Sequence, residues 1–286
     1  MARTLINPAD QIPAASLTRV MMNVATAGKA VITKVIAGNN ITISNTGIDS
    51  GTGDVTINAV GSEISVSINQ IYFTANGTYT PTPGVRFILV EMLGGSGGSG
   101  GCPSPGAGKY AISGAGCGGV YLRFWSPPVA AQSVTIGAGG IAGTASTVGG
   151  NGGNGGNSIF AGCTAGGGFG GIQGVATVAP FKVAGATNTN GFIIAASISA
   201  YMAIAGQPGG TGYALATPLM VGGEGGGSIY GEGGGSNILL AAASSLAGTP
   251  GLGFGAGAGS AMVATTGAFV SGAPGQHGFV QITEFF

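Results

Sequence analysis

The chain holds 62 glycines among its 286 residues, about three times the roughly 7% of ordinary proteins. Charged residues make up only 6%, and eight Lys and Arg balance eight Asp and Glu, so the formal net charge is zero. Nucleic-acid binding needs a positive excess, and disordered tails are poor in apolar residues, whereas 44% of this chain is hydrophobic. Composition therefore excludes both classes, and the lack of a sustained Gly-X-Y repeat excludes collagen.

Glycine and charge are distributed unevenly along the chain. Residues 1–80 contain seven of the 62 glycines and eight of the sixteen charged residues. The first ten residues carry one arginine and no apolar run after it, so we expect no secretory signal and synthesis in the cytoplasm. The three cysteines, Cys102, Cys117 and Cys163, are accordingly expected to be reduced and buried, with neither a disulfide nor a metal site.

The N-terminal quarter predicts one short helix over 14–25 and then short strands separated by Gly- and Asn-rich turns. The strand predictions cover 30–36, 41–43, 55–57 and 64–68. Alternation of apolar residues gives each strand one apolar face, but strands this short cannot bury it within so small a unit. We therefore expect several chains to share one core.

One segment of this quarter resembles a known structural module. Residues 37–59 (AGNNITISNTGIDSGTGDVTINA) resemble the β-rich shaft modules of bacteriophage tail fibres, which are usually homotrimeric. The resemblance implies a trimeric shaft module over 31–70. It also implies that residues 1–30 attach the protein to other tail or baseplate proteins.

The remainder of the chain predicts a small β-sandwich interrupted by glycine-rich segments. Its strand-forming stretches are 71–93, 120–136 and 278–286, and the alternating final strand predicts closure of a sheet begun near Phe73. The apolar window 192–205 is shorter than the ~20 residues of a membrane-spanning helix. We expect a buried strand or loop there.

A three-residue period is the most informative feature of the glycine-rich segments. Residues 94–101 and 149–157 repeat Gly-Gly-x, which matches the three residues per turn of a left-handed extended helix. Only glycine lets such backbones approach closely enough to pair, so we predict a bundle of polyglycine II-type helices with Asn151, Asn154 and Asn157 in an outward row. Flexible Gly/Ser linkers and a silk-like material, suggested by the alternation in 251–260, are the alternatives.

Several elements together resemble the C-terminal glycine-rich domain of phage tail fibres and tail tip adhesins. They are 73–79 (FTANGTY), an apolar strand running into GGSGG, 133–140 (SVTIGAGG), 156–160 (GNSIF) and the closing 278–284 (GFVQITE). The resemblance covers most of residues 70–286 and departs from the family in the long, glycine-poor insert 175–205.

This second resemblance implies a fold, a place and a role. The fold is mainly β, with a trimeric β-rich N-terminal shaft followed by a small β-sandwich that carries polyglycine II-type helices and loops. The place is the tail fibre of a virion, with residues 71–286 as the receptor-binding domain. The role is that of an adhesin whose loops recognise a bacterial outer-surface protein or polysaccharide.

Glycine density also produces false matches to nucleotide-binding motifs. Gly137 and Gly139 match a dinucleotide fingerprint, but no acidic residue lies between Glu91 and Glu224 to bind a ribose. Gly108 and Lys109 resemble the end of a phosphate-binding loop, but Pro103 and Tyr110 replace its required residues. No cofactor is expected.

Catalysis requires groups that this region scarcely contains. Glycoside hydrolysis needs two placed carboxylates, and Glu224 and Glu232 are the one plausible pair, so a capsule or surface-polysaccharide depolymerase is the alternative function. His277 is the single histidine and residues 70–286 contain no Asp, which leaves no Ser-His-Asp triad within the region. We assign no catalytic or metal-binding residue and expect a protein that is not an enzyme.

Receptor contact is assigned to the glycine-poor loops 175–205 and 213–221 and to aromatic residues between the glycine segments. A nearly uncharged surface with exposed aromatics suits docking by apolar contact and hydrogen bonds. The candidate contact residues are Phe181, Lys182, Phe192, Tyr201, Tyr213 and Tyr230.

Overall fold

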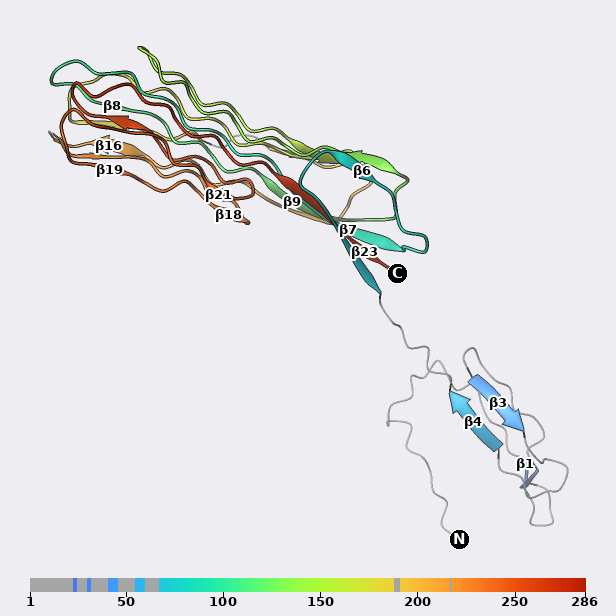
Figure 1. Ribbon diagram of the computed structural model, residues 1–286. Coiled ribbons are helices and arrows are strands. Elements are labelled where there is room, and N and C mark those ends of the chain that lie inside the picture. Colours follow the sequence, from blue (N-terminus) through green and yellow to red (C-terminus); the bar gives the residue numbers. More distant parts are fainter. Residues whose placement is uncertain are drawn as a thin grey trace, which may run out of the picture. The chain divides into compact units, whose positions relative to one another are not determined.

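Figure 1 shows the computed structural model of the protein, which describes residues 23–24, 30–31, 41–45, 55–59 and 67–286, except 188–190 and 217. The chain divides into two compact units, Met1–Ser65 and Val66–Phe286. Every regular element of the described residues is a strand, and none is a helix. The fold is therefore mainly β, as the sequence predicts.

The first unit contains two antiparallel pairs among its described residues. β1 (Asn23–Val24) pairs with β2 (Ala30–Val31), and β3 (Ile41–Asn45) pairs with β4 (Val55–Ala59). The strands predicted at 41–43 and 55–57 are confirmed. The described end of the helix predicted over 14–25 is a strand instead, because pairing with β2 overrides a weak helical period.

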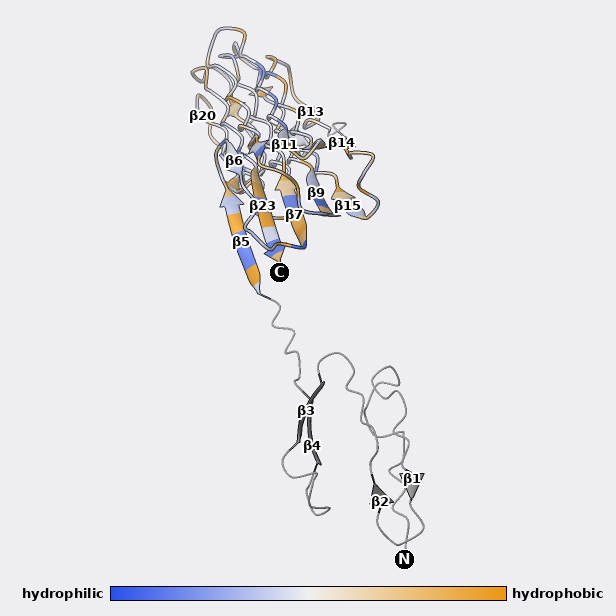
Figure 2. Ribbon diagram, turned by 90° about the vertical axis from the view of Figure 1, so that its right-hand side faces the viewer, coloured by the Kyte–Doolittle hydropathy of each residue, from blue (hydrophilic) through white to orange (hydrophobic). Residues whose placement is uncertain are grey.

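A five-stranded antiparallel sheet lies at the end of the second unit where the chain enters it (Figure 2). In spatial order its strands are β15 (Tyr201–Ile204), β9 (Tyr121–Ser126), β7 (Phe87–Leu93), β23 (Phe279–Phe285) and β5 (Ile68–Phe73). Val280 of β23 lies opposite Phe73 of β5, so the predicted closure of the sheet by the final strand is confirmed.

The apolar window 192–205 contributes two strands to this region rather than a membrane span. Its last residues form β15 at the edge of the sheet, and its first two form β14 (Phe192–Ile193). None of the described segments forms a helix with the length and apolar character needed to cross a bilayer.

A second layer packs on one face of the five-stranded sheet. Its strands are β6 (Gly77–Tyr79), β10 (Gln132–Val134), β11 (Ser158–Phe160), β12 (Cys163–Ala165) and β14. Alternate residues of β7, including Ile88, Val90 and Met92, point at this layer and are buried with Tyr79 and Phe160. Strand alternation thus builds a small β-sandwich, as expected for apolar residues at every second position.

The opposite end of the second unit, which we call the distal end, consists of short strands and loops (Figure 1). The loops are 103–109, 175–183, 213–221, 239–246 and 264–270. The strands there are β8 (Ala111–Ile112), β13 (Phe181–Val183), β16 (Gly212–Ala214), β17 (Met220–Val221), β19 (Ile238–Leu239), β20 (Ser245–Leu246) and β22 (Met262–Val263). A second core of Tyr110, Ile112, Met220 and Met262 holds them together. β18 (Gly231–Glu232) and β21 (Leu252–Gly253) pair between the two ends.

Extended glycine threads connect the two ends, and residues 94–102 form the central thread. Its N–H groups donate hydrogen bonds with a period of three residues, so that every third residue donates to the same neighbouring segment. Gly94, Gly97 and Gly100 donate to 114–120; Gly95, Gly98 and Gly101 donate to 150–156; Ser96, Ser99 and Cys102 donate to 270–276, over 2.8–3.1 Å. Its carbonyl groups accept from 168–174, 140–143 and Ala258, so six segments surround the thread.

The central thread has no room for Cβ atoms at its glycines. A Cβ on Gly97 would lie 1.9 Å from the carbonyl oxygen of Phe169, and one on Gly98 would lie 2.1 Å from that of Ile141. The third position of each triplet does hold a side chain: Ser96 and Ser99 are fully buried and bond to neighbouring backbone. In each Gly-Gly-Ser triplet, therefore, the two glycines lie in close contact with neighbouring backbones and the serine side chain makes a hydrogen bond.

The asparagine row predicted for 151–157 lies on the surface of the bundle and also has a bonding role. Asn151, Asn154 and Asn157 are exposed, and their Oδ1 atoms accept the N–H groups of Gln173, Gly170 and Gly167 at 2.8–3.0 Å. The same three-residue step thus places a side-chain acceptor opposite every third N–H group of the thread 167–173.

Adding one methyl group inside the bundle tests this packing. We expect Gly97→Ala to lower the free energy of unfolding by about 3 kcal/mol or more, because its Cβ meets rigid backbone rather than a movable side chain. Gly106→Ala is the matched control, since no atom lies within 4 Å of its added Cβ. Chemical denaturation measures both, and equal stabilities would contradict the close-packed arrangement.

The asparagine row makes a second, local prediction. Asn154→Ala removes the acceptor of the Gly170 N–H, so we expect faster hydrogen exchange at that amide and a loss of about 1 kcal/mol in stability. Thr147→Ala, at an exposed loop position, serves as the control. Unchanged exchange at Gly170 would show that the asparagine bond contributes nothing to the edge of the bundle.

Candidate functional site

The six residues predicted to contact a receptor lie in three separate places. Phe181, Lys182 and Tyr213 are at the distal end, Phe192 and Tyr201 at one open side of the sandwich, and Tyr230 over the outer face of the five-stranded sheet. The glycine-poor insert 175–205 likewise begins at the distal end and finishes in β15, so it is not a loop at one end of the unit.

At the distal end, the strand register brings two predicted residues together. Lys182 of β13 lies directly opposite Tyr213 of β16, and both side chains are exposed. Phe181 is half-buried and packs against the distal core through Ala214 and its neighbours. Lys182 and Tyr213 are therefore available for contact, whereas Phe181 supports the strand that presents them.

The distal loops are joined to one another by main-chain and side-chain hydrogen bonds. The Gly108 N–H donates to Thr265 Oγ1 at 2.8 Å, Ser104 Oγ donates to the Gly267 carbonyl at 2.7 Å, and the Ala243 N–H donates to the Thr265 carbonyl at 3.0 Å. These bonds join the loops 103–109, 239–246 and 264–270. Backbone bonds between Tyr110 and Thr177 and the pairing of β13 with β16 connect the loops 175–183 and 213–221 to the same surface.

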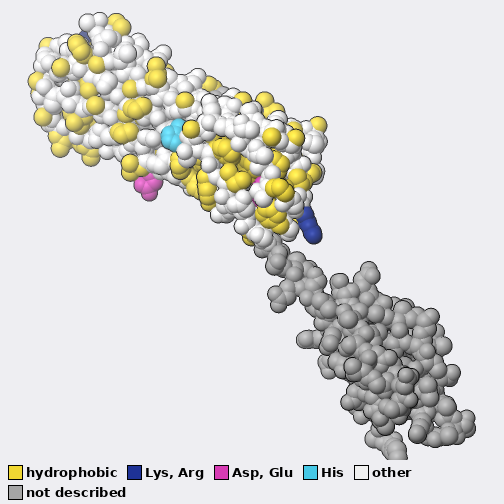
Figure 3. Space-filling view, turned by 45° about the vertical axis from the view of Figure 1, so that its right-hand side comes forward, with side chains coloured by type: hydrophobic (Ala, Val, Ile, Leu, Met, Phe, Trp, Pro, Cys, Tyr) yellow, Lys and Arg dark blue, Asp and Glu magenta, His cyan; other side chains and the backbone are white. Residues whose placement is uncertain are grey.

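This surface carries apolar side chains that sequence reasoning missed. Val178, Leu215, Leu240 and Phe269 are each at least half exposed. The only charged residues of these loops are Lys109 and Lys182, both exposed, and Figure 3 shows a basic side chain at this end. A signal was present in the sequence, because four of these loops (175–183, 213–221, 239–246 and 264–270) are glycine-poor segments between threads, but the threads had to be ordered before the loops could be grouped.

Phe192 and Tyr201 close the open side of the sandwich. Their ring centroids are 5.5 Å apart, and they link β14 of one layer to β15 of the other. Both remain about half exposed. They therefore shield the core between the layers, at the other end of the second unit from the distal strand that carries Tyr213.

Tyr230 belongs to a cluster that covers part of the outer sheet face. Its ring packs against Phe279 at 4.8 Å, and its hydroxyl donates to Glu91 Oε1 at 3.2 Å. The same carboxylate oxygen accepts a short hydrogen bond from Tyr121. Burial and the neighbouring Glu91 carboxylate raise the pKa of both tyrosines, so they stay protonated and act as donors.

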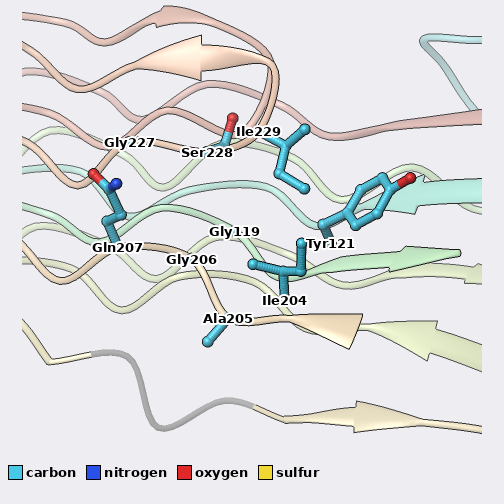
Figure 4. Close-up of a pocket in the computed structure, with 9 residues that line it drawn as sticks. All are labelled: Gly119, Tyr121, Ile204, Ala205, Gly206, Gln207, Gly227, Ser228 and Ile229. Carbon is cyan, nitrogen blue, oxygen red and sulfur yellow. The ribbon is translucent and has the colours of Figure 1, made fainter. Parts of the chain in front are cut away.

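Two hollows border this face. The first, of about 100 Å³, lies between 204–207 and 227–229; Figure 4 shows Ile204 and Ile229 approaching from opposite segments beside Tyr121. The second is lined by Arg123, Trp125, Tyr201 and Met202 along β9 and β15. Neither is lined by Glu224 or Glu232, the carboxylates considered for glycoside hydrolysis, and both of those are exposed.

Among the carboxylates of the described residues, only that of Glu284 has no exposed surface. Oε1 accepts from the Tyr79 hydroxyl at 2.8 Å and the Thr82 N–H at 2.9 Å, while Oε2 accepts from Thr82 Oγ1 at 2.6 Å and Asn69 Nδ2 at 2.8 Å. Burial alone would raise the pKa of Glu284, but these four donors outweigh it and lower the pKa. The carboxylate therefore ties β23 to β5 and to the chain after β6.

Glu284 makes stability depend on pH. Because its folded-state pKa lies below the ordinary value of 4.5, its contribution is complete above that value and is lost as the pH falls through the folded-state pKa. We expect Glu284→Gln to lower the free energy of unfolding by about 3 kcal/mol at neutral pH. On acidification, the melting temperature of this variant should fall less than that of the wild-type chain. The exposed Glu232→Gln is the control, and parallel pH profiles would refute this role.

The remaining reactive groups of the described residues serve packing. The three cysteines are free and buried, and burial raises the pKa of Cys102 to about 12. His277 packs its ring against Phe254 at 5.2 Å. Over residues 67–286, apart from the short gaps, no three His, Cys, Asp or Glu side chains gather as metal ligands. Gly137 and Gly139 lie in a bundle thread and not at the start of a helix.

Fold and surface together define a glycine-rich β-protein in which backbone-paired threads join a β-sandwich to a cluster of loops. The chain belongs to a family described as a glycine-rich domain, whose sequence profile matches residues 73–283. No curated protein matches the chain. The family therefore accounts for the glycine-rich part predicted from the sequence and covers nearly all of the second unit.

Proposed function

We propose that the protein is a phage tail fibre adhesin whose distal end recognises a bacterial outer-surface protein or polysaccharide. The observation that supports this most strongly is that the second unit has hydrogen-bonded threads along its length and exposed apolar side chains in the loops at one end. Threads with almost no side chains are cross-linked by main-chain hydrogen bonds, whereas the exposed apolar side chains and two lysines of the distal loops lie at the end away from β5.

In this proposal the threads are polyglycine II-type helices that act as a rigid support. The three-residue period of the hydrogen bonds and the excluded Cβ atoms support this geometry rather than that of flexible linkers or a silk-like strand. A rigid support lowers the entropy lost when the loops bind, because the loops are held in place beforehand.

The surroundings of this site in a virion follow from the same proposal. The first unit serves as a homotrimeric shaft module, with residues 1–30 attached to other tail or baseplate proteins. The chemistry at the distal end is recognition without catalysis or cofactor. Two lysines without a nearby carboxylate in the same loops favour a receptor that carries acidic groups.

Binding to bacterial cells tests the proposal. The full chain, labelled and applied to a panel of bacterial strains, is expected to bind the susceptible ones. We expect the double variant Lys182→Ser with Tyr213→Ser to bind at least about tenfold more weakly, since exposed hot-spot contacts contribute 1–2 kcal/mol or more. Ile141→Ser, an exposed residue on a bundle thread, is the matched control.

Two results would overturn the proposal. One is unchanged binding by the double variant and by further substitutions at Leu215, Leu240 and Phe269, which would move the site away from the distal end. The other is cleavage of a surface polysaccharide by the wild-type chain that Glu224→Gln abolishes, which would favour the depolymerase.

A further inference from the structure

The asparagine row places a chemically reactive residue pair on the surface of the bundle. Asn151 and Asn154 are each followed by glycine, whereas Asn157 is followed by serine. All three asparagine side chains are exposed. Asparagine is a thermolabile residue, and a glycine after it has no side chain to hinder attack by the glycine nitrogen on the asparagine Cγ atom. The two Asn-Gly pairs are therefore the members of the row that are prone to lose ammonia.

Packing requires both residues of each pair. Asn151 and Asn154 accept backbone N–H groups of the thread 167–173 through Oδ1, at 2.8–2.9 Å. A Cβ on either following glycine, Gly152 or Gly155, would lie 2.2 Å from a carbonyl oxygen of the central thread. A larger residue therefore does not fit after either asparagine, and replacing the asparagine removes an acceptor. Only the surrounding structure can protect these pairs.

The closed bundle holds the nitrogen atoms that would attack. The Gly152 N–H donates to the Gly171 carbonyl at 2.8 Å, and the Gly155 N–H donates to the Gly168 carbonyl at 2.8 Å. Such a nitrogen must lose its proton to react, and amide protons held in this way become available only when the structure opens locally or globally. The Oδ1 bonds also fix the asparagine side chains against the neighbouring thread, which keeps Cγ from turning toward the nitrogen.

We propose that Asn151 and Asn154 are latent deamidation sites that react only when the threads separate. In the open chain, the Gly152 nitrogen bonds to Asn151 Cγ, the Cγ–Nδ2 bond breaks, and the N–H proton leaves with the amide nitrogen as ammonia. Water then adds to either carbonyl of the cyclic imide and opens it, which gives aspartate or isoaspartate. Asn154 and Gly155 react by the same steps.

The two products affect the bundle differently. Aspartate keeps two acceptor oxygens, so the bond to the neighbouring thread can form again, with one added negative charge. Isoaspartate carries the main chain through Cβ and Cγ, which adds one backbone atom and shifts the following residues out of the three-residue period. A thread modified in this way cannot regain its close contacts, so opening followed by this reaction is irreversible.

Peptide mass spectrometry of the full chain, incubated at mildly alkaline pH, tests the inference. In denaturant, we expect Asn151 and Asn154 to deamidate faster than Asn157, which is the internal control because serine follows it. In native buffer, deamidation of the two sites should be at least about a hundredfold slower than in denaturant. At denaturant concentrations below the unfolding transition, it should rise in proportion to hydrogen exchange at Gly152 and Gly155.

A variant pair adds a second measurement in native buffer. We expect Gly97→Ala, which opens the bundle, to speed deamidation of Asn151 and Asn154, while Gly106→Ala leaves it unchanged. The denaturant series on the wild-type chain provides the test even if Gly97→Ala does not fold.

Two results would overturn the inference. One is deamidation of the two sites at the same rate in native buffer and in denaturant. The other is a rate that stays constant while hydrogen exchange at Gly152 and Gly155 increases, which would separate the reaction from opening of the threads. Neither readout involves cell binding by the distal end.

Discussion

Main-chain hydrogen bonding between threads that lack side chains is the constraint on which the second unit depends. In an ordinary core, side chains fill the space between backbones and hydrogen bonds stay within sheets and helices. Here the central thread bonds directly to its neighbours on all sides, and the carbonyl of Phe169 occupies the space where a Cβ of Gly97 would lie. Glycine content is therefore a packing requirement in this protein and not a sign of flexibility.

The apolar cores are confined to the two ends of the bundle. One lies between the layers of the sandwich around Phe124 and Phe160, and the other lies under the distal loops around Tyr110 and Met262. Each core fixes the ends of the threads, and the threads fix the separation of the cores. Loss of either core would leave the threads without defined registers, because a repeated glycine pattern specifies none by itself.

Much of this fold could be predicted from the sequence, because apolar residues recur every second position in the strands and the Gly-Gly-x pattern recurs every third position in the threads. Alternation predicted that the final strand closes the sheet begun near Phe73, and the Gly-Gly-x repeat predicted close backbone approach with Asn151, Asn154 and Asn157 facing outward. Neighbour choice among the threads could not be predicted, since glycine carries no side chain to distinguish one partner from another. The grouping of the distal loops and the separation of Tyr213 from Tyr201 depend on that choice.

The pairing of β5 with β23 also determines how the protein would respond to mechanical load. The strand by which the chain enters the second unit lies beside its last strand, and both are bonded in register over six residue pairs. A pull between Ile68 and the distal loops would act along the threads, across hydrogen bonds that lie sideways to it. Such bonds are loaded in shear and must break together, so resistance to extension would come from their number and not from the strength of any one contact.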